Sequence, residues 1–304
     1  MREYSLALLF LTIGCTYVPT DTGDISAYFC PRDDCAGIIA TLMQNANRSI
    51  HCSFYSFDIH SMIKILLEKS RKIDVRLVLN GRNYKNQISG DSIKLTKRNN
   101  HNKFCIIDDK VVITGSFNPT KSGLDDRNNL VIVHSDIISE NYEDEFSEQW
   151  AGSNDIETTD KIIIIDGKRV QNIFCPDDDC KGYYLRELRN ARSSIYFMIF
   201  SFTSEDVADV LLTINASVKG IVDNSQSNNQ YSQYSRLKGF GLDIGIYNKN
   251  TTLHHKVFII DNRTVITGSA NPTANGFSGN DENILIIHDK DIAEKYLKEF
   301  EGLE

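Results

Sequence analysis

The pattern of apolar and polar positions along the chain alternates between helical and extended periodicity. Amphipathic stretches predict helices at residues 36–47, 59–69 and 137–150, and again at residues 182–191, 205–212 and 291–300. Continuous apolar runs between them predict buried strands, such as residues 49–57 and 194–202. Helices that alternate with buried strands indicate the α/β class, and we expect a sandwich in which helices cover a sheet.

The order of predicted elements occurs twice. Phe29-Cys30-Pro31 recurs as Phe174-Cys175-Pro176, and the strongest block, residues 101–120, recurs as residues 254–273. An Asn followed by an apolar strand recurs at residues 129–134 and 283–288, before the last predicted helix of each copy. Each copy is too long to be one solenoid unit, so we predict a duplication into two domains, residues 27–153 and 173–304. The linker near Ser153 is polar.

The first residues predict an exported protein. Arg2 precedes an apolar run at residues 6–13, which is too short to span a bilayer and has the layout of a secretory signal. We therefore predict a signal peptide at residues 1–15 and a secreted or cell-envelope location. Gly14-Cys15 resembles the cleavage box of bacterial lipoproteins, which leaves a lipid anchor on Cys15 open. The alternative interpretation is a buried N-terminal core segment.

Cysteine spacing agrees with export. Each half begins with the same loop, which runs from Cys30 to Cys35 in the first half and from Cys175 to Cys180 in the second. In an oxidising compartment each pair predicts a small disulfide-closed loop. The alternative is one zinc site with the four thiolates as ligands.

Two further cysteines differ between the halves. Cys52 and Cys105 stand where the second half has Phe197 and Phe258. We expect an exchange of small for large side chains inside the core, and a third disulfide is the alternative.

The strongest repeated block contains side chains that suit a phosphate. Its members are His101, Lys103, Asp108, Ser116 and Asn118 in the first copy, and His254, Lys256, Asp261, Ser269 and Asn271 in the second. Because residues two apart share a face of a strand, each His projects with its Lys, and each Ser projects with its Asn on the returning strand. The imidazole can attack phosphorus or move protons, and the other groups can hold non-bridging oxygens.

Other polar residues of this block have structural interpretations. Asp108 and Asp261 close hairpins, and we expect them to act structurally rather than as reactants. His255 is one residue out of phase and should point away from the site. His134 and His288 lie at strand ends, where a structural role is expected.

These residues resemble the HxKxxxxD and GSxN signature of the phospholipase D superfamily, and the resemblance extends over both repeats. It implies two α/β halves packed about a pseudo-twofold axis, with both motifs in one cleft. A monomer would then hold the complete site. It also implies a phosphohistidine intermediate and a reaction without metal or cofactor, in line with a sequence that suggests no carboxylate cluster for a catalytic metal.

One departure from the family pattern separates the two histidines. Family members often carry an acidic residue after GSxN that orients a catalytic His, and the second half has Glu282 where the first has Asn128. Asn cannot stabilise an imidazolium by charge, so the histidines should differ in basicity. The resemblance favours His101 as nucleophile. The asymmetry agrees if Glu282 acts across the axis on His101 and Asn128 on His254, and a contact within each half would reverse the assignment.

The sequence supports a lipid substrate and a nucleic-acid substrate almost equally. The formal net charge of −8 argues against a general nucleic-acid binder. The loops before the two motifs are locally basic, through Arg82, Lys85, Lys94, Lys97 and Arg98 in one half and Lys219, Arg236, Lys238 and Lys249 in the other. A positive cleft suits an anionic lipid headgroup or a polynucleotide, whereas solvated charged loops are the alternative.

Three functions compete on these grounds. Aromatic residues for base stacking are sparse in these loops, and export favours a phospholipid diester at a membrane surface. A metal-independent exported nuclease for DNA or RNA is the second hypothesis. A non-catalytic phosphate-binding module is the third, and two complete motifs argue against it.

Overall fold

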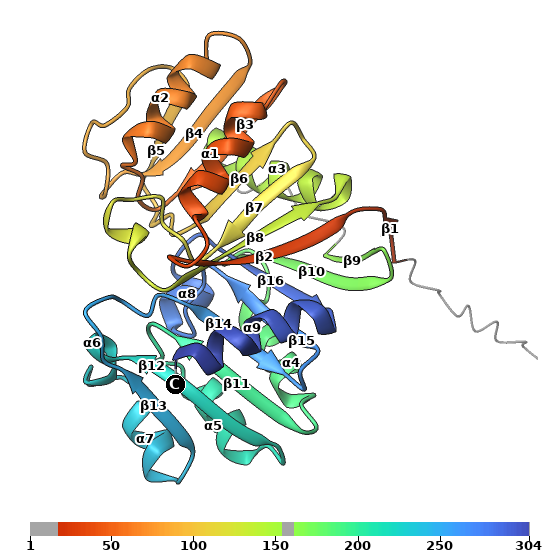
Figure 1. Cartoon of the computed structure of the whole chain (residues 1–304), viewed down its shortest axis with the longest axis vertical. Coiled ribbons are helices and arrows are strands. Elements are labelled where there is room, and N and C mark those ends of the chain that lie inside the picture. Colours follow the sequence, from red (N-terminus) through yellow and green to blue (C-terminus); the bar gives the residue numbers. More distant parts are fainter. Residues whose placement is uncertain (1–17, 154–160, 304) are drawn as a thin grey trace, which may run out of the picture.

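The computed structural model describes residues 18–153 and 161–303, which form two sheets, one for each half of the chain (Figure 1). The seven-stranded sheet has the order β2-β8-β7-β6-β3-β4-β5, and the nine-stranded sheet has the order β1-β9-β10-β16-β15-β14-β11-β12-β13. The predicted signal peptide and Cys15 lie outside the described residues.

The first half builds its sheet around the repeated block. Its elements are β2 (Asp24–Cys30), α1 (Cys35–Asn45), β3 (Ser49–Phe54), α2 (His60–Lys69), β4 (Asp74–Asn80), β5 (Ile93–Thr96), β6 (Lys103–Ile107), β7 (Val111–Gly115), a 3-10 turn (Ser122–Leu124), β8 (Asn128–His134) and α3 (Asp136–Ala151). The central strands are buried along their whole length, as their apolar runs predict.

The second half repeats this order. Its elements are β10 (Lys168–Cys175), α4 (Cys180–Arg189), β11 (Ser194–Ile199), α5 (Glu205–Thr213), β12 (Ser217–Asp223), α6 (Asn224–Ser227), α7 (Tyr234–Gly239), β13 (Asp243–Tyr247), β14 (Lys256–Ile260), β15 (Thr264–Gly268), α8 (Ala274–Ser278), β16 (Glu282–His288) and α9 (Lys290–Leu303). The short strands β1 (Thr20–Asp21) and β9 (Ile162–Ile165) extend the larger sheet at one edge.

One apolar core joins the two halves. It contains residues of both sheets together with residues of α3 and α9, whereas α1 and α2 cover one outer face and α4 and α5 cover the other (Figure 1). Tyr142 packs edge-on against Phe174 with ring centroids 4.9 Å apart, and Phe29 packs against Tyr296 in the same way at 4.9 Å. These matching contacts cross between the halves in opposite directions. The predicted α/β fold of two duplicated halves about a pseudo-twofold axis is therefore confirmed; the residue bounds of the two domains stay a prediction.

The disulfides confirm one cysteine prediction and correct another. Cys30 is bonded to Cys35 and Cys175 to Cys180, as predicted, so these thiols do not form a zinc site. Cys52 and Cys105 are also bonded to each other, so the expected small-for-large exchange is wrong as an account of this pair. Disulfides are typical of proteins outside the reducing cytosol.

Strand register explains the third disulfide. Cys52 on β3 lies opposite Cys105 on β6, and the same register places Phe197 opposite Phe258 in the second half. Facing side chains in an antiparallel pair are neighbours, so two cysteines there are close enough to bond. Gly220 lies beside Phe197 and leaves room for its ring, because a Cβ at this glycine would meet that ring at 2.1 Å.

Among the described residues, none of the helices is both long and apolar enough to cross a membrane.

Candidate active site

The two motifs meet where the halves exchange backbone hydrogen bonds. His101 N donates to Asp281 O at 2.9 Å, and His254 N donates to Arg127 O at 2.8 Å. Each HxKxxxxD motif is therefore fixed next to the start of a strand from the other half, β16 in one case and β8 in the other. This exchange brings both histidines and both lysines into one site.

Buried polar side chains of the two halves also bond to each other. Asn129 Nδ2 donates to Thr267 Oγ1 at 2.7 Å, and Thr114 Oγ1 donates to Asn283 Oδ1 at 2.6 Å. All four side chains are buried, and satisfied buried polar groups of this kind favour one unique arrangement. The network therefore fixes the two motifs relative to each other.

Each histidine is held by the other half. Both carboxylate oxygens of Glu282 lie 2.8 Å from His101 Nδ1. His254 Nδ1 donates to Asn128 Oδ1 at 2.8 Å and lies 3.1 Å from Ser116 O. The contact that the sequence suggested across the axis is thus present in both directions. Because Nδ1 is the donor in each ring, Nε2 carries the lone pair that can attack or accept a proton.

The histidines differ in electrostatic surroundings. Burial lowers the pKa of His101, and the charge of Glu282 opposes this effect. Burial also lowers the pKa of His254, and here the charges of Lys256 and Lys103 add to it, so its pKa falls well below the usual value. His254 is therefore the less basic ring, in the direction that the Glu282/Asn128 difference predicts.

Two buried lysines complete the cationic site. Lys103 Nζ donates to His101 O, and Lys256 Nζ donates to His254 O at 2.7 Å. Burial lowers the pKa of Lys103 to about 7, although Glu282 opposes it. Burial and the charge of Lys103 together lower the pKa of Lys256 well below its usual value. A phosphate would supply the negative charge that keeps both ammonium groups protonated.

The lowered pKa of Lys103 predicts that the protein takes up a proton when it binds a phosphodiester. Lys103, with a pKa of about 7 in the free site, must be protonated to bind an anion, so affinity should fall as pH rises above that value, by up to about tenfold per pH unit. Calorimetric titration with dimethyl phosphate, which does not titrate in this range, measures the effect. Lys103→Met should bind weakly and show a smaller slope, because only Lys256 then remains to take up a proton on binding. Affinity that stays constant for the wild type from below to well above this pKa would contradict the prediction.

The serines and asparagines of the motifs occupy two different environments. Ser116 is fully buried, donates to Asn128 Oδ1 at 3.1 Å and accepts from Asn129 N at 3.0 Å. Ser269 is equally buried and accepts from Asn283 N at 2.9 Å. Both hydroxyls thus hold the strand ends through hydrogen bonds. The expectation that they face the phosphate stays a prediction.

Asn118 and Asn271 are the half-buried amides of the site. Asn271 Oδ1 accepts from Ser201 N at 3.3 Å, whereas Asn118 Oδ1 is buried and has no hydrogen-bond partner among the described residues. An amide can donate its N–H groups to a phosphate oxygen. The two amides therefore remain candidates for that role.

The two motif aspartates lie at the far ends of their strands. Asp108 accepts from the backbone N of residues 47–49, and Asp261 accepts from the backbone N of residues 192–194. Burial alone would raise the pKa of Asp108, but these backbone donors lower it. Both aspartates occupy hairpin turns with positive φ, consistent with the structural role expected for them.

The three further histidines with predicted structural roles, out of five besides the two motif histidines, lie outside the site. His255 is buried, with Nδ1 3.3 Å from Asn129 Oδ1 and Nε2 3.7 Å from Glu299 Oε1, so it points into the junction between the halves. His134 and His288 end β8 and β16, as the pattern predicts.

Sequence reasoning missed an aromatic ring beside each histidine. The Tyr55 ring lies 4.6 Å from the His101 ring, and the Phe200 ring lies 5.1 Å from the His254 ring. Each ring also has the matching lysine Nζ above it, at 5.2 Å and 5.3 Å. Tyr55 and Phe200 occupy the same position in the two repeats, and this repetition was the available signal.

Many of the predicted basic residues have partners of their own. Arg98 pairs at 3.1 Å with Asp281, beside the first motif, and Arg236 pairs with Asp209. Lys94 donates to Trp150 O, and Lys219 lies 3.5 Å from Asp243. These contacts weaken the expectation of a broadly positive cleft.

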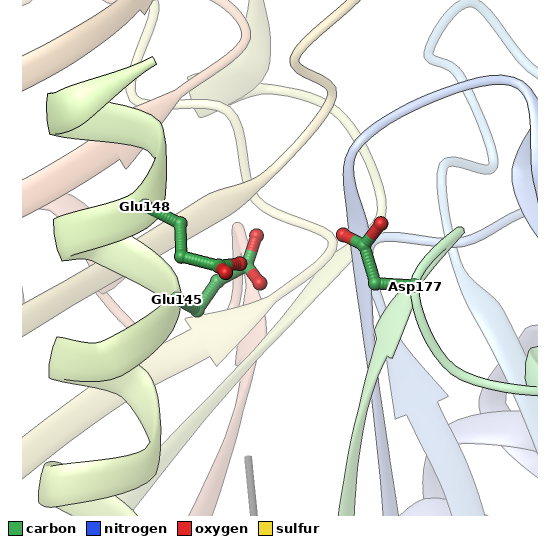
Figure 2. Close-up of side chains that lie close together, drawn as sticks. All are labelled: Glu145, Glu148 and Asp177. Carbon is green, nitrogen blue, oxygen red and sulfur yellow. The ribbon is translucent and has the colours of Figure 1, made fainter. Parts of the chain in front are cut away.

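An acidic cluster lies beside the first motif. Glu145 and Glu148 project from α3 toward Asp177, which follows β10 (Figure 2), and their carboxylate oxygens lie within 4.8 Å of one another. They help to line a cavity of about 450 Å³ that Arg98 and Asp281 also line. Burial raises the pKa of Glu145 to about 8, together with the charges of the surrounding carboxylates. Acidic groups alone do not define a metal site, and we assign none here.

The equivalent junction between the halves, beside α9, carries a different residue in the loop. Glu299 holds the same place after Tyr296 on α9 that Glu145 holds after Tyr142 on α3. There the loop residue is Arg32, whose Nη1 lies 3.0 Å from Glu299 Oε2, whereas Asp177 is its counterpart in the second loop. The arginine of the first loop is thus replaced by an aspartate in the second loop.

This difference predicts a stabilising substitution. Asp177→Arg should raise the free energy of unfolding by about 1 kcal/mol near neutral pH, because it places a cation beside Glu145. In the wild type, the raised pKa means that Glu145 binds its proton more tightly when folded, so this group lowers stability as pH rises from its unfolded value toward about 8. Asp177→Arg should flatten that decline.

Chemical denaturation across this pH range measures both effects. Arg32→Asp is the mirror control and should destabilise the protein. Equal stability of Asp177→Arg and the wild type at all pH values would show that the two junctions are not equivalent.

Comparison with known proteins places the chain in a family. The model of the family described as "Cardiolipin synthase, PLD-like domain" matches residues 39–150 and 184–303, so the chain belongs to this family of phospholipase D-like proteins and carries two copies of its domain. Each matched segment contains one HxKxxxxD motif.

Particular relatives match in part. A phospholipase D of Rickettsia felis is 33% identical over 135 residues, which are 43% of this chain and 66% of that protein. A mitochondrial cardiolipin hydrolase of Xenopus laevis is 34% identical over 135 residues, which are 42% of this chain and 64% of that protein. The matches thus span just under two thirds of these relatives. The phosphatidylserine synthase of Haemophilus influenzae has the same fold over 91% of this chain and 85% of its own, with a TM-score of 0.70 and 11% identity.

Proposed function

We propose that this protein is an exported phosphodiesterase that hydrolyses a phospholipid headgroup diester through a covalent phosphohistidine. The observation that carries the proposal is the pair of histidines in one site, each held through Nδ1 by a residue of the other half. One Nε2 is thereby available as nucleophile and the other for proton transfer. The family and the names of its lipid-hydrolysing relatives support a lipid substrate.

In the first step, His101 Nε2 attacks phosphorus and the bond to the leaving alcohol breaks. His254 gives its proton to that alcohol oxygen. Glu282 stabilises the positive charge of the phosphohistidine, as a carboxylate does for a catalytic imidazolium. Lys103 and Lys256 hold the non-bridging oxygens, and the amides of Asn118 and Asn271 are the further donors to them.

In the second step, neutral His254 takes a proton from water, and the hydroxide formed attacks phosphorus. The bond between phosphorus and His101 breaks, which releases the phosphate monoester and restores both histidines. The low pKa of His254 in the free site suits a group that must give and regain a proton, and bound phosphate raises that pKa by its negative charge. Both steps balance without a metal ion.

Parallel assays test this function. We expect purified mature protein to release headgroup from vesicles of phosphatidylcholine or cardiolipin, in the presence of EDTA, faster than it cleaves single- or double-stranded DNA. Cleavage of DNA with no lipid hydrolysis would favour the nuclease alternative. Binding to both without turnover would favour a phosphate-binding module. Loss of activity in EDTA, restored by a divalent ion, would contradict the mechanism.

Export and membrane association belong to the same proposal. The disulfides agree with an oxidising compartment, and the predicted signal peptide supplies the route. A lipid on Cys15 would place the site at a membrane surface. Intact-mass measurement of the native protein tests both points, and a chain that retains residues 1–15 with free thiols would contradict them.

A further inference from the structure

Each half carries the same disulfide loop at the end of a strand beside the active site. The loop closed by Cys30 and Cys35 follows β2, and the loop closed by Cys175 and Cys180 follows β10. Both bridges have a Cα–Cα separation of 5.8 Å and are almost fully buried. The proposed reaction assigns these loops no task.

Strand register places each bridge next to an orienting residue. Cys175 is directly opposite Glu282 in the antiparallel pair of β10 and β16. Cys30 is directly opposite Asn128 in the pair of β2 and β8. Residues directly opposite project from the same face of a sheet, with Cβ atoms about 4.5–5.5 Å apart. Each disulfide therefore lies beside the side chain that holds the histidine of the other half.

The loops are fixed by hydrogen bonds as well as by the bridges. In the first loop, Phe29 N donates to Asp33 Oδ2 at 2.7 Å and Asp33 N donates to Phe29 O at 2.8 Å. In the second loop, Asp178 makes the same two contacts with Phe174, at 2.9 Å and 2.8 Å. The loop ends directly in α1 or α4, so the bridge joins the strand end to the first turn of a packed helix.

This attachment matters because the orienting residues stand at strand ends. Glu282 is the first residue of β16 and Asn128 is the first residue of β8, where a strand frays most easily. The neighbouring strands β10 and β2 end beside these residues, so the helix-anchored disulfide adds a covalent restraint to the hydrogen bonds that hold the strand ends. A displacement of about 1 Å at a catalytic group can cost about 100-fold in rate.

We propose that the two disulfide loops are positioning elements of the active site. The loop of Cys175 and Cys180 fixes Glu282 against His101, and the loop of Cys30 and Cys35 fixes Asn128 against His254. The inference rests on the proposed function for its kinetic meaning. It assigns the two mirror-related bridges to different steps of one reaction.

Pre-steady-state kinetics with bis(p-nitrophenyl) phosphate test this assignment. Its leaving group departs without protonation, so the first turnover reports attack by His101 and later turnovers report hydrolysis assisted by His254. Cys175→Ala/Cys180→Ala should slow the first turnover by about 10- to 100-fold. The mirror variant Cys30→Ala/Cys35→Ala should keep the first-turnover rate constant and slow the later turnovers.

The burst amplitude separates positioning from folding. Amplitude counts folded sites, so a merely structural role would lower it and leave the rate constants per site unchanged. If the double variants do not fold, Asp178→Ala and Asp33→Ala loosen the same loops with every bridge intact and should show the same division of steps.

Wild-type rate constants per site in both variants, or an equal effect of both on one step, would overturn the positioning role. A wild type that neither forms a phosphoenzyme nor turns over would contradict the proposed function instead.

Discussion

Glu282→Gln is expected to lower kcat/KM by about 10³-fold, because it removes the only carboxylate that contacts either catalytic histidine among the described residues. Gln can still bond to His101 Nδ1, so the ring should keep its place. What is lost is the negative charge that stabilises the phosphohistidine. Steady-state rates on vesicles and with a nitrophenyl diester measure the effect.

Asn128→Asp is the matched control for this substitution. It adds a carboxylate beside His254 and should raise the pKa of that ring, which moves the alkaline limb of the pH–rate profile upward. Its effect on the maximal rate should be far smaller than that of Glu282→Gln. A larger loss in Asn128→Asp than in Glu282→Gln would assign the charge-stabilised histidine to the opposite half.

Removal of either histidine should lower lipid hydrolysis by about 10⁴-fold, since the nucleophile and the proton donor act in the same step. The two variants should differ in their release of product when the leaving group needs no proton. With a nitrophenyl diester, His254→Ala should still release one equivalent of nitrophenol rapidly and then stall. His101→Ala should release none above the background rate. Equal rapid release by both variants would contradict the division of roles.

Periodicity and the repeat predicted the two α/β halves, because alternating patterns define the elements and their order occurs twice. The recurrence of His101 and Lys103 as His254 and Lys256 carried the resemblance to the phospholipase D superfamily, and that resemblance implied that both motifs share one site. The sequence left open whether Glu282 contacts His101 across the axis or His254 within its own half. The structure shows the contact across the axis, which local pattern alone does not determine.

Features that depend on tertiary detail could not be predicted in this way. The bond between Cys52 and Cys105 requires the register of β3 and β6, which periodicity does not determine. Arg98 and Arg236 were counted toward a positive cleft, but their acidic partners come from distant parts of the chain. Burial of Ser116 depends on how the turn after β7 meets β8, because its hydroxyl closes that junction.

Trapping of the covalent intermediate tests the central claim most directly. His254→Ala should be mixed with the nitrophenyl diester, quenched, digested and mapped by mass spectrometry under conditions that preserve phosphohistidine. The account predicts an adduct on His101 that hydrolyses slowly, and no adduct in His101→Ala. A stable adduct on His254 in the His101→Ala protein would contradict the assignment of the nucleophile, and turnover of the wild type with no adduct on either histidine in any variant would contradict covalent catalysis itself.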